Sequence, residues 1–431
     1  MKRKIAIKLV EWKNSRFRKP LILQGARQVG KTYTLLEFGK NNYDNVAYIN
    51  FEMNESYRKL FDGDISPERL IPLLSRMTGE TVTKERTLMI FDEVQLCERA
   101  LTSLKYFAEL APEYHIVAAG SLLGIAVNRT QFSFPVGKVD FLTMYPMNFE
   151  EFLLAFNEEE LIDKIRFCFN NDTPMDDAYH PILLEYYHKY LVVGGMPEAV
   201  SKFIATQDYL LVRLVQNQIL NGYLDDMSKY NKNNEIKKTR LTYNSITVQL
   251  SKMNTRFQYK LVKSGGRAAE FENAIEWLEL TGIISICYKV EQVKKPLKNY
   301  IDADAFKVYM SDIGLLCAKK ELKAEDVLFM VPALNDFKGG MVENYVSTQL
   351  QALGYSRYFW ESSGVAEIDF IIQRGDCIIP VEVKSATNTQ AKSLQIYMKT
   401  YKPPYAIKIS EKNFGMVGGK KSIPLYAVFC L

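Results

Sequence analysis

Short apolar runs alternate with helical patterns over the first third of the chain. The runs Leu21–Leu23 and Leu88–Phe91, and the segments 45–52 and 114–123, have the composition of buried strands. Strands that alternate with helices are typical of a parallel sheet covered by those helices. We therefore expect an α/β fold that begins with a parallel-sheet domain over residues 1–150.

A helical pattern occupies the next part of the chain, from residue 145 to residue 227. It is interrupted at 170–177 and again at 192–200, where a glycine pair and Pro197 break a helix. We expect a helical lid or connector over residues 151–228, with a hinge at the second interruption.

Residues 229–325 show several helical patterns followed by two strand patterns. A turn at 262–268 precedes a helix at 269–282, and strands follow at 282–290 and 306–316, as in a winged-helix-like domain. The outward positions of that helix carry the acids Glu270, Glu272, Glu276 and Glu279. Because acids repel phosphate, we favour a structural or protein-contacting winged helix, with DNA reading as the alternative.

The last hundred residues combine two helical patterns with two strand patterns. The helical patterns cover 339–354 and 388–401, and the strands between them are joined by the turn "QRGD". We expect a restriction-endonuclease-like α/β domain over residues 326–431.

Composition narrows the kinds of chemistry open to the chain. With 431 residues, 47% of them hydrophobic and 24% charged, it is expected to fold as two to four soluble domains, and its net charge of +5 permits nucleic acid as a partner. Six cysteines form no CxxC pair, so neither a zinc site nor a disulfide framework is indicated. With only three histidines, metal chemistry would depend on carboxylates, which favours Mg²⁺ or Mn²⁺ over zinc.

The N-terminus and the hydropathy pattern predict a cytoplasmic protein. The first 20 residues are basic but have no long apolar core, unlike a signal peptide. No apolar run reaches the roughly 18 residues that span a bilayer, so we expect no membrane segment.

The loop after the first strand fits the phosphate-binding pattern G-x-x-x-x-G-K-[ST]. Its glycines allow backbone N–H groups to surround phosphates, and the following helix N-terminus adds positive potential. The lysine would contact the β- and γ-phosphates of ATP, and the threonine hydroxyl would bind Mg²⁺. The predicted nucleotide-binding residues of the loop are Gly25, Ala26, Arg27, Gln28, Val29, Gly30, Lys31 and Thr32.

Two acids follow the apolar run Leu88–Phe91. We expect Asp92 to position Mg²⁺, directly or through water, and Glu93 to polarise the attacking water as general base. Such a pair argues for hydrolysis of ATP rather than binding alone.

Three polar residues further along could also face the nucleotide. Ser121 ends a strand, so it either senses the γ-phosphate or caps a helix. Arg129 and Lys138 either reach a phosphate, in cis or across the subunit interface of a homo-oligomer, or are solvated loop charges.

The last domain carries a second set of charged residues. Glu343 lies in the first predicted helix, Asp369 in one strand, and Glu382 and Lys384 in the next. Carboxylates on adjacent strands can share Mg²⁺ or Mn²⁺, and the lysine can orient water or neutralise a phosphate. Asp369 and Glu382 are the predicted metal ligands, whereas the alternative is a structural salt-bridge cluster.

Nine stretches occur in the order found in one family. They are "RKPLILQGARQVGKT", "FDEVQ", "GSLLG", "YPMNFEEFL", "GGMPEAV", "VYMSDIGLL", "ENYVSTQL", "EIDFII" and "IPVEVKS". The chain resembles the AAA-type P-loop ATPases of bacteria and archaea whose C-terminal domain of unknown function is similar to PD-(D/E)xK nucleases. The resemblance implies nuclease-like roles for Glu343, Asp369, Glu382 and Lys384. Lys138 stands where family members often carry arginine, which weakens an arginine-finger role.

Together these observations predict an Mg²⁺-dependent ATPase whose nucleotide cycle controls a nuclease-like module directed at DNA or RNA. The alternative is a regulatory ATP-binding protein that does not cut. It would use its winged-helix and nuclease-like surfaces to bind a protein partner.

Overall fold

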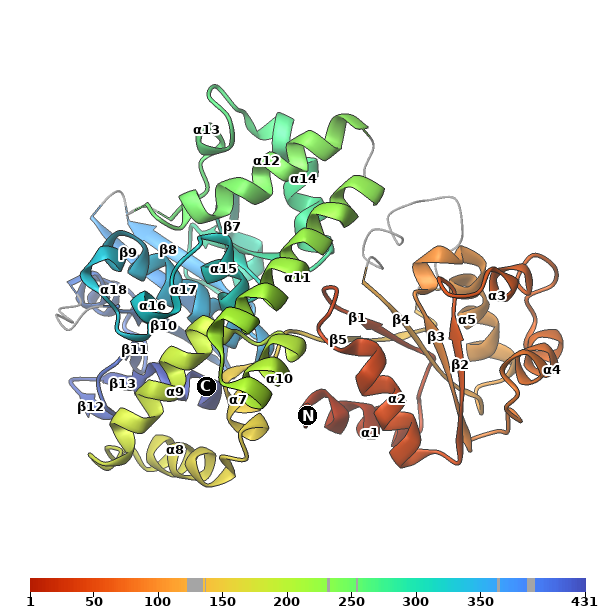
Figure 1. Cartoon of the computed structure of the whole chain (residues 1–431). Helices are drawn as coiled ribbons and strands as arrows, with labels where there is room; N and C mark the ends of the chain where they lie inside the picture. The colour runs from red at the N-terminus through yellow and green to blue at the C-terminus, as the bar shows by residue number, and fades with distance from the viewer. Residues whose placement is uncertain (122–134, 136, 231–232, 253–254, 363–364, 386–391) are drawn as a thin grey trace. The chain divides into compact units, whose positions relative to one another are not determined.

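The computed structural model describes residues 1–121, 135, 137–230, 233–252, 255–362, 365–385 and 392–431 (Figure 1). The chain forms two compact units. The first comprises Lys2–Tyr145 with Leu280–Gly282, and the second comprises Met1, Pro146–Glu279 and Ile283–Leu431. No helix among the described residues has the length and apolar character needed to cross a membrane.

The N-terminal unit is built on a parallel sheet, which in the described residues has five strands in the order β2-β3-β4-β1-β5. The strands are β1 (Leu21–Gln24), β2 (Asn45–Asn50), β3 (Thr87–Asp92), β4 (His115–Gly120) and β5 (Asp140–Thr143). The helices are α1 (Ile5–Asn14), α2 (Lys31–Asn42), α3 (Glu55–Lys59), α4 (Pro67–Thr78) and α5 (Glu98–Leu110), with a 3₁₀ turn η1 (Val94–Leu96). The parallel α/β sheet predicted for this part of the chain is confirmed.

The strand order explains how helices cover both faces of this sheet. The connection from β1 to β2 runs across the sheet in one direction, and those from β2 to β3 and from β3 to β4 run back. Because such crossovers are right-handed, α2 must lie on one face and α4 and α5 on the other, as Figure 1 shows. The carboxyl ends of all five strands therefore meet at one edge, which carries the predicted nucleotide residues.

A cluster of aromatic rings fixes the end of β3. Phe51, Phe61 and Phe91 are fully buried and meet edge to face, with ring centroids 5.6–5.9 Å apart. Phe91 immediately precedes Asp92, so this packing holds the backbone from which the acidic pair projects.

The C-terminal unit begins with the expected helical stretch. Its helices are α7 (Phe149–Ala155), α8 (Glu159–Asn171), α9 (Tyr179–Val193), α10 (Pro197–Thr206), α11 (Tyr209–Tyr230), α12 (Asn233–Gln249), α13 (Tyr259–Val262), α14 (Ala268–Leu280), α15 (Ile313–Lys319), α16 (Ala324–Leu328), α17 (Asn335–Ala352) and α18 (Lys392–Tyr401). Short 3₁₀ helices occur at η2 (Leu297–Tyr300), η3 (Pro332–Leu334) and η4 (Leu425–Cys430). The predicted helix break between α9 and α10 is confirmed.

A mixed sheet forms the rest of this unit. In the described residues it has eight strands in the order β12-β13-β11-β10-β9-β8-β6-β7. They are β6 (Ile284–Val290), β7 (Ile301–Met310), β8 (Tyr358–Ser362), β9 (Ala366–Arg374), β10 (Cys377–Val383), β11 (Ala406–Ser410), β12 (Gly415–Val417) and β13 (Lys420–Pro424). The helix–strand–strand–helix order expected for the last hundred residues is present as α17, β9, β10 and α18, with β8 added after α17.

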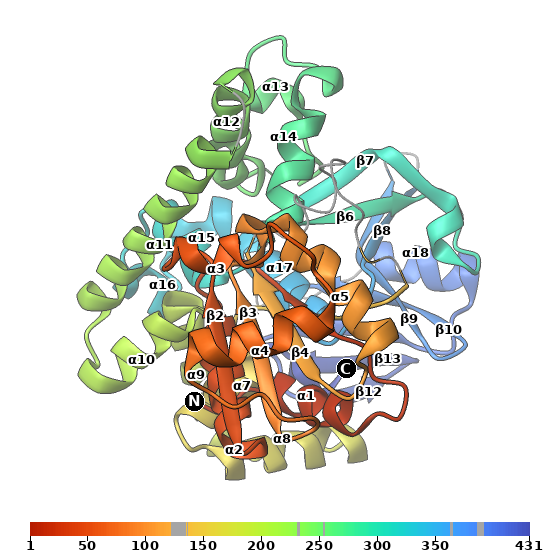
Figure 2. The same ribbon diagram turned by 90° about the vertical axis from the view of Figure 1, so that its right-hand side faces the viewer.

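The β6–β7 hairpin joins this sheet across the expected domain boundary at residue 326. β6 pairs with β8 in parallel, Tyr288 opposite Tyr358 and Lys289 opposite Phe359. Figure 2 shows the hairpin beside β8. The helix and paired strands expected of a winged helix are present as α14, β6 and β7, but the two strands belong to the sheet of the last domain. The winged-helix assignment itself stays a prediction.

The buried Asp312 connects the stretch "VYMSDIGLL" to the stretch "GGMPEAV". Asp312 caps the start of α15 by accepting the N–H of Leu315 at 2.8 Å, and its other oxygen accepts the N–H of Gly195 at 2.6 Å. A side chain at Gly194 would overlap the Asp312 carboxylate. This contact explains why a glycine pair and an aspartate occur in segments far apart in the sequence.

Candidate functional site

The phosphate loop connects β1 to α2 in a conformation that requires glycine. Gly25 has φ +150° and Gly30 has φ +93°, both unfavourable for other residues. A Cβ at Gly25 would also overlap the carbonyl oxygen of Met144. The backbone of the loop therefore lies close to the backbone of Met144. The loop leads directly into the N-terminus of α2, where N–H groups favour an anion.

Lys31 is buried at the first position of α2 and is only 8% exposed. Its ammonium donates hydrogen bonds to the carbonyl oxygens of Gly25 and Ala26, both at 2.9 Å. Burial lowers the pKa of Lys31 to about 8, although the charges of Glu93 and Asp92 act in the opposite direction. The Lys31 ammonium is thus bonded to carbonyl groups of the loop, and it can exchange these bonds for bonds to a phosphate.

Thr32 and Asp92 meet beside the loop. The Thr32 hydroxyl donates to Oδ2 of Asp92 at 2.8 Å, and the Tyr48 hydroxyl donates to the same oxygen at 2.8 Å. Asp92 is 2% exposed, at the carboxyl end of β3. A hydroxyl and a carboxylate are oxygen donors of the kind that Mg²⁺ prefers, so these residues fit the ion.

Glu93 follows Asp92 in a left-handed conformation, with φ 51°. Gln95 donates to its Oε2 at 2.5 Å, which holds the carboxylate in one orientation. Burial raises the pKa of Glu93, and the charge of Asp92 adds to the increase. A carboxylate with a raised pKa is a better proton acceptor, as general-base catalysis requires.

The remaining candidates of this unit differ in position. Ser121 follows β4, whose last residue Gly120 lies opposite Gln24 of β1, so Ser121 is at the same sheet edge as the phosphate loop. Lys138 precedes β5 and is therefore at the opposite edge, where its ammonium pairs with Glu109 at 2.9 Å. Arg129 lies outside the described residues.

Sequence reasoning missed Tyr48 and Gln95, which hold the two acids. Tyr48 lies in β2, and its hydroxyl also accepts a hydrogen bond from Asn50 at 3.1 Å. Burial raises the pKa of Tyr48 to about 12, so the hydroxyl remains a donor to Asp92. The polar side of β2 was the available signal, because alternation in a strand places Tyr48 and Asn50 on one face.

The C-terminal unit brings four predicted residues together. Glu343 of α17, Asp369 of β9 and Glu382 of β10 interact electrostatically in its interior. The ammonium of Lys384 lies 2.5 Å from Oε1 of Glu382, and the N–H of Val383 donates to Oδ2 of Asp369 at 2.7 Å. Their catalytic and metal-binding roles stay predictions.

Three further residues, which sequence reasoning missed, complete this group. The ammonium of Lys307, on β7, lies 2.8 Å from Oε1 of Glu343 and 2.5 Å from Oε1 of Glu367. The Tyr309 hydroxyl donates to the same oxygen of Glu343. We call the set Lys307, Tyr309, Glu343, Glu367, Asp369, Glu382 and Lys384 the carboxylate cluster. The available signal was a lone lysine inside an apolar run, Ala305–Met310, because such a lysine needs a buried partner.

Burial and like charge act strongly on the acids of the carboxylate cluster. Burial raises the pKa of Asp369 well above its usual value, and Glu382 and Glu343 raise it further. Burial also raises the pKa of Glu382, against the opposing effect of Lys384. Among the described residues, Oε2 of Glu382 is buried without a hydrogen-bond partner. This oxygen is a position open to a further cation or proton.

The cluster does not offer a ready metal shell. In the described part of the chain, no group of three or more His, Cys, Asp or Glu side chains is arranged to hold a metal ion. The physical reason is Lys307, whose ammonium lies between Glu343 and Glu367 and is hydrogen-bonded to the first. Oε1 of Glu343 therefore already has a cationic partner, whereas Oε2 of Glu382 has no hydrogen-bond partner among the described residues.

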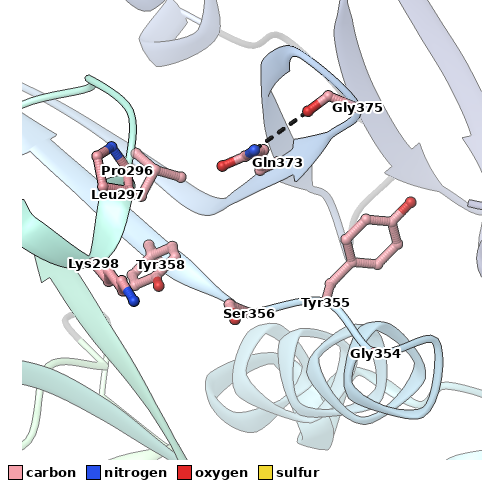
Figure 3. A pocket seen from close by; sticks show the side chains of 9 residues that line it. All are labelled: Pro296, Leu297, Lys298, Gly354, Tyr355, Ser356, Tyr358, Gln373 and Gly375. Atoms are coloured by element: carbon pink, nitrogen blue, oxygen red, sulfur yellow. Dashed lines mark hydrogen bonds between the residues drawn. The ribbon is translucent and has the colours of Figure 1, made fainter.

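A surface pocket of about 380 Å³ lies elsewhere on the same unit (Figure 3). It is formed by η2, the turn after α17 and the β9–β10 turn, and includes Tyr355, Tyr358 and Gln373. Gln373 is four residues along β9 from Asp369, a separation of about 13 Å. The pocket is thus distinct from the carboxylate cluster.

The sheet order, the glycine-bounded loop and the acidic pair at the end of β3 define a P-loop NTPase domain. The AAA domain family matches residues 17–153, in agreement with that class. Two domains of unknown function match later parts of the chain, DUF8612 over residues 184–326 and DUF4143 over residues 338–428. No curated protein matches the chain.

The comparison with solved structures found matches to archaeal proteins. One is the Walker-type ATPase PABY2304 of Pyrococcus abyssi, with 14% identity and a TM-score of 0.44 over 73% of this chain and 94% of that one. Another is the ORC1 protein of Aeropyrum pernix in complex with DNA, with 13% identity and a TM-score of 0.28 over 76% and 91%. A third is ORC2 of the same organism in ADPNP–ADP complexes, with 12% identity and a TM-score of 0.35 over 76% and 92%.

Proposed function

We propose that the chain hydrolyses ATP and that its nucleotide cycle controls a nucleic-acid-directed C-terminal module. The observation that carries the first part is the joint placement of Lys31, Thr32, Asp92 and Glu93 at one sheet edge. Lys31 and the N-terminus of α2 supply positive potential for phosphates, and Glu93 is a half-buried carboxylate that Gln95 holds at the same sheet edge. This combination supports hydrolysis, because binding alone needs no general base.

The proposed reaction assigns one task to each residue. Lys31 leaves the carbonyl groups of Gly25 and Ala26 and bonds to the β- and γ-phosphates. Mg²⁺, held by Thr32 and Asp92, would neutralise phosphate charge. Glu93 accepts a proton from water while the water oxygen bonds to the γ-phosphorus, and the bond from that phosphorus to the β–γ bridging oxygen breaks to give ADP and phosphate.

Steady-state ATP hydrolysis by the full chain tests this proposal. We expect Glu93→Gln to lower kcat by about 100-fold or more while ATP still binds, and Lys31→Ala to weaken ATP binding. Glu55→Gln, at an exposed position of α3, is the matched control and should hydrolyse ATP like the wild type. Hydrolysis at the wild-type rate by Glu93→Gln would refute the general-base role, and an inactive wild type would refute the ATPase proposal.

The carboxylate cluster supports the second part of the proposal. Asp369 and Glu382 lie on adjacent strands with Lys384 beside Glu382, an arrangement suited to one divalent ion and a phosphate. We expect the full chain to bind DNA or RNA and to cleave it with Mg²⁺ or Mn²⁺, and Glu382→Ala to abolish cleavage. Exposed Glu325→Ala, in the same unit, is the control.

The non-cutting alternative is favoured by a specific observation, the bonding of Glu343 to Lys307. It predicts that wild type and Glu382→Ala both fail to cleave nucleic acid, while ATP still changes the affinity for a protein partner. Cleavage that is retained in Glu382→Ala would refute the catalytic role of the cluster.

A further inference from the structure

Lys307 occupies the position in the carboxylate cluster where a divalent ion would be expected to contact Glu343. Its ammonium is 1% exposed and lies 2.8 Å from Glu343 and 2.5 Å from Glu367. Tyr309 donates to the same oxygen of Glu343, so that oxygen already accepts two hydrogen bonds. A buried ammonium between two carboxylates is a fully paired charge, the condition under which burial of a lysine is tolerated.

A divalent ion and this ammonium exclude each other at Oε1 of Glu343. Mg²⁺ or Mn²⁺ bound to a carboxylate oxygen lies about 2.0–2.2 Å from it, within the space that the Lys307 ammonium now fills. Two cations at such a separation in a buried site repel strongly, because little water screens them. Metal binding through Oε1 of Glu343 would therefore require Lys307 to leave its buried position.

Lys307 lies on the β6–β7 hairpin, a different element from those that carry the predicted catalytic residues. The residues predicted for catalysis come from α17, β9 and β10, whereas Lys307 comes from β7, at the far edge of the same sheet. β7 pairs with β6, β6 pairs with β8, and β8 pairs with β9, so the hairpin is anchored through β8 to the strand that carries Glu367 and Asp369. The β6–β7 hairpin thus positions the lysine, and backbone hydrogen bonds to β8 hold the hairpin in place.

We propose that the Lys307 ammonium serves as a cation of the carboxylate cluster. It pairs with Glu343 and Glu367 where a metal ion would otherwise bind. Glu343 is consequently a structural partner of Lys307 and not a metal ligand. Divalent metal is confined to the pair Asp369 and Glu382, where Oε2 of Glu382 is buried and unpartnered among the described residues. The inference goes beyond the proposed function and depends neither on ATP hydrolysis nor on cleavage.

Thermal unfolding of the full chain without nucleotide, in EDTA or in millimolar Mn²⁺, tests the inference. We expect Lys307→Met to lower Tm in EDTA, since the buried Glu343 and the partly exposed Glu367 lose their cation, and Mn²⁺ to restore at least half of the loss. The double variant Lys307→Met/Glu343→Gln should show less recovery. Lys319→Met is the control, because the Lys319 ammonium contacts the Asn244 amide and its Tm should not respond to Mn²⁺.

Two outcomes of this experiment would overturn the inference. One is a wild-type Tm that rises with Mn²⁺ as much as that of Lys307→Met, and the other is a Lys307→Met variant that unfolds like the wild type in EDTA. If Lys307→Met does not fold in either solution, a second measurement decides. It compares Mn²⁺ binding by the wild type with binding by Glu343→Gln, both without nucleotide.

The second measurement separates a ligand from a residue that only pairs with lysine. Loss of a direct metal ligand lowers metal affinity by at least about tenfold. Affinities that agree within about threefold, or no measurable binding by either protein, support the inference. A larger loss in Glu343→Gln overturns it, and neither result depends on whether the enzyme hydrolyses ATP.

Discussion

Burial of Lys31 disfavours the charged ammonium, which is the form that would bind a phosphate. The ammonium is stabilised by the loop carbonyls and by Glu93 and Asp92, yet burial still lowers its pKa to about 8. An incoming triphosphate would favour the charged form much more strongly than the loop does. Nucleotide binding and protonation of Lys31 should therefore be linked.

We predict that ATP affinity falls as the pH rises above about 8. Below that pH the free protein already carries the ammonium, whereas above it ATP binding must take up a proton, so Kd should rise by at most about tenfold per pH unit. Calorimetric titration between about pH 7 and about pH 9.5 measures the effect. Lys31→Arg is the control, because arginine keeps its charge in this range and its Kd should be flat. A wild-type Kd that does not change across this range would contradict the prediction.

At the scale of the element, α17 carries Glu343 and also packs closely against the backbone of Leu250. Gly340 of this helix is buried, and a Cβ there would overlap the carbonyl oxygen of Leu250, just after α12. Gly339, one residue earlier, is exposed, and a Cβ there would meet nothing within 4 Å. Two adjacent glycines in one helix thus have opposite surroundings.

We expect the two glycines to respond to alanine with opposite signs. Gly340→Ala should lower the free energy of unfolding by about 1–3 kcal/mol, because backbone cannot move aside as a flexible side chain can. Gly339→Ala should raise it by about 0.5–1 kcal/mol through its better helix propensity. Urea unfolding of the full chain, followed by near-UV circular dichroism, measures both. Shifts of the same sign would contradict the packing described for α17.

At the scale of the whole molecule, the mixed sheet is continuous across the expected boundary at residue 326. The strands β6 and β7 precede that boundary, and β8 follows it. A fragment that starts at 326 would expose the edge of β8 and leave Glu343 buried without Lys307 and Tyr309. An unpaired buried charge of this kind is strongly destabilising.

We therefore predict that residues 146–431 fold as an independent fragment, whereas residues 326–431 do not. The longer fragment should unfold in one cooperative transition with a near-UV circular dichroism signal, and the shorter one should show neither. Cooperative unfolding of both fragments at a similar Tm would show that the β6–β7 hairpin is dispensable to the sheet.

Local spacing was enough to predict which residues gather at one edge of the parallel sheet. The loop from Gly25 to Thr32 and the pair Asp92–Glu93 are brought together by backbone geometry and by strand ends that meet at that edge. Both are properties of short segments, so the residue pattern carries them directly. The helix–strand order around Asp369 and Glu382 could be predicted for the same reason.

Contacts between distant segments decided the rest. No local pattern indicates that Lys307 pairs with Glu343, 36 residues later, or that β6 pairs with β8 rather than closing a separate domain. A lysine in an apolar strand signals that a buried partner exists, but the partner depends on which strands become neighbours. The amino-acid pattern therefore established which charged groups the C-terminal unit contains, and the packing of the β6–β7 hairpin against the last domain established which of them are already paired.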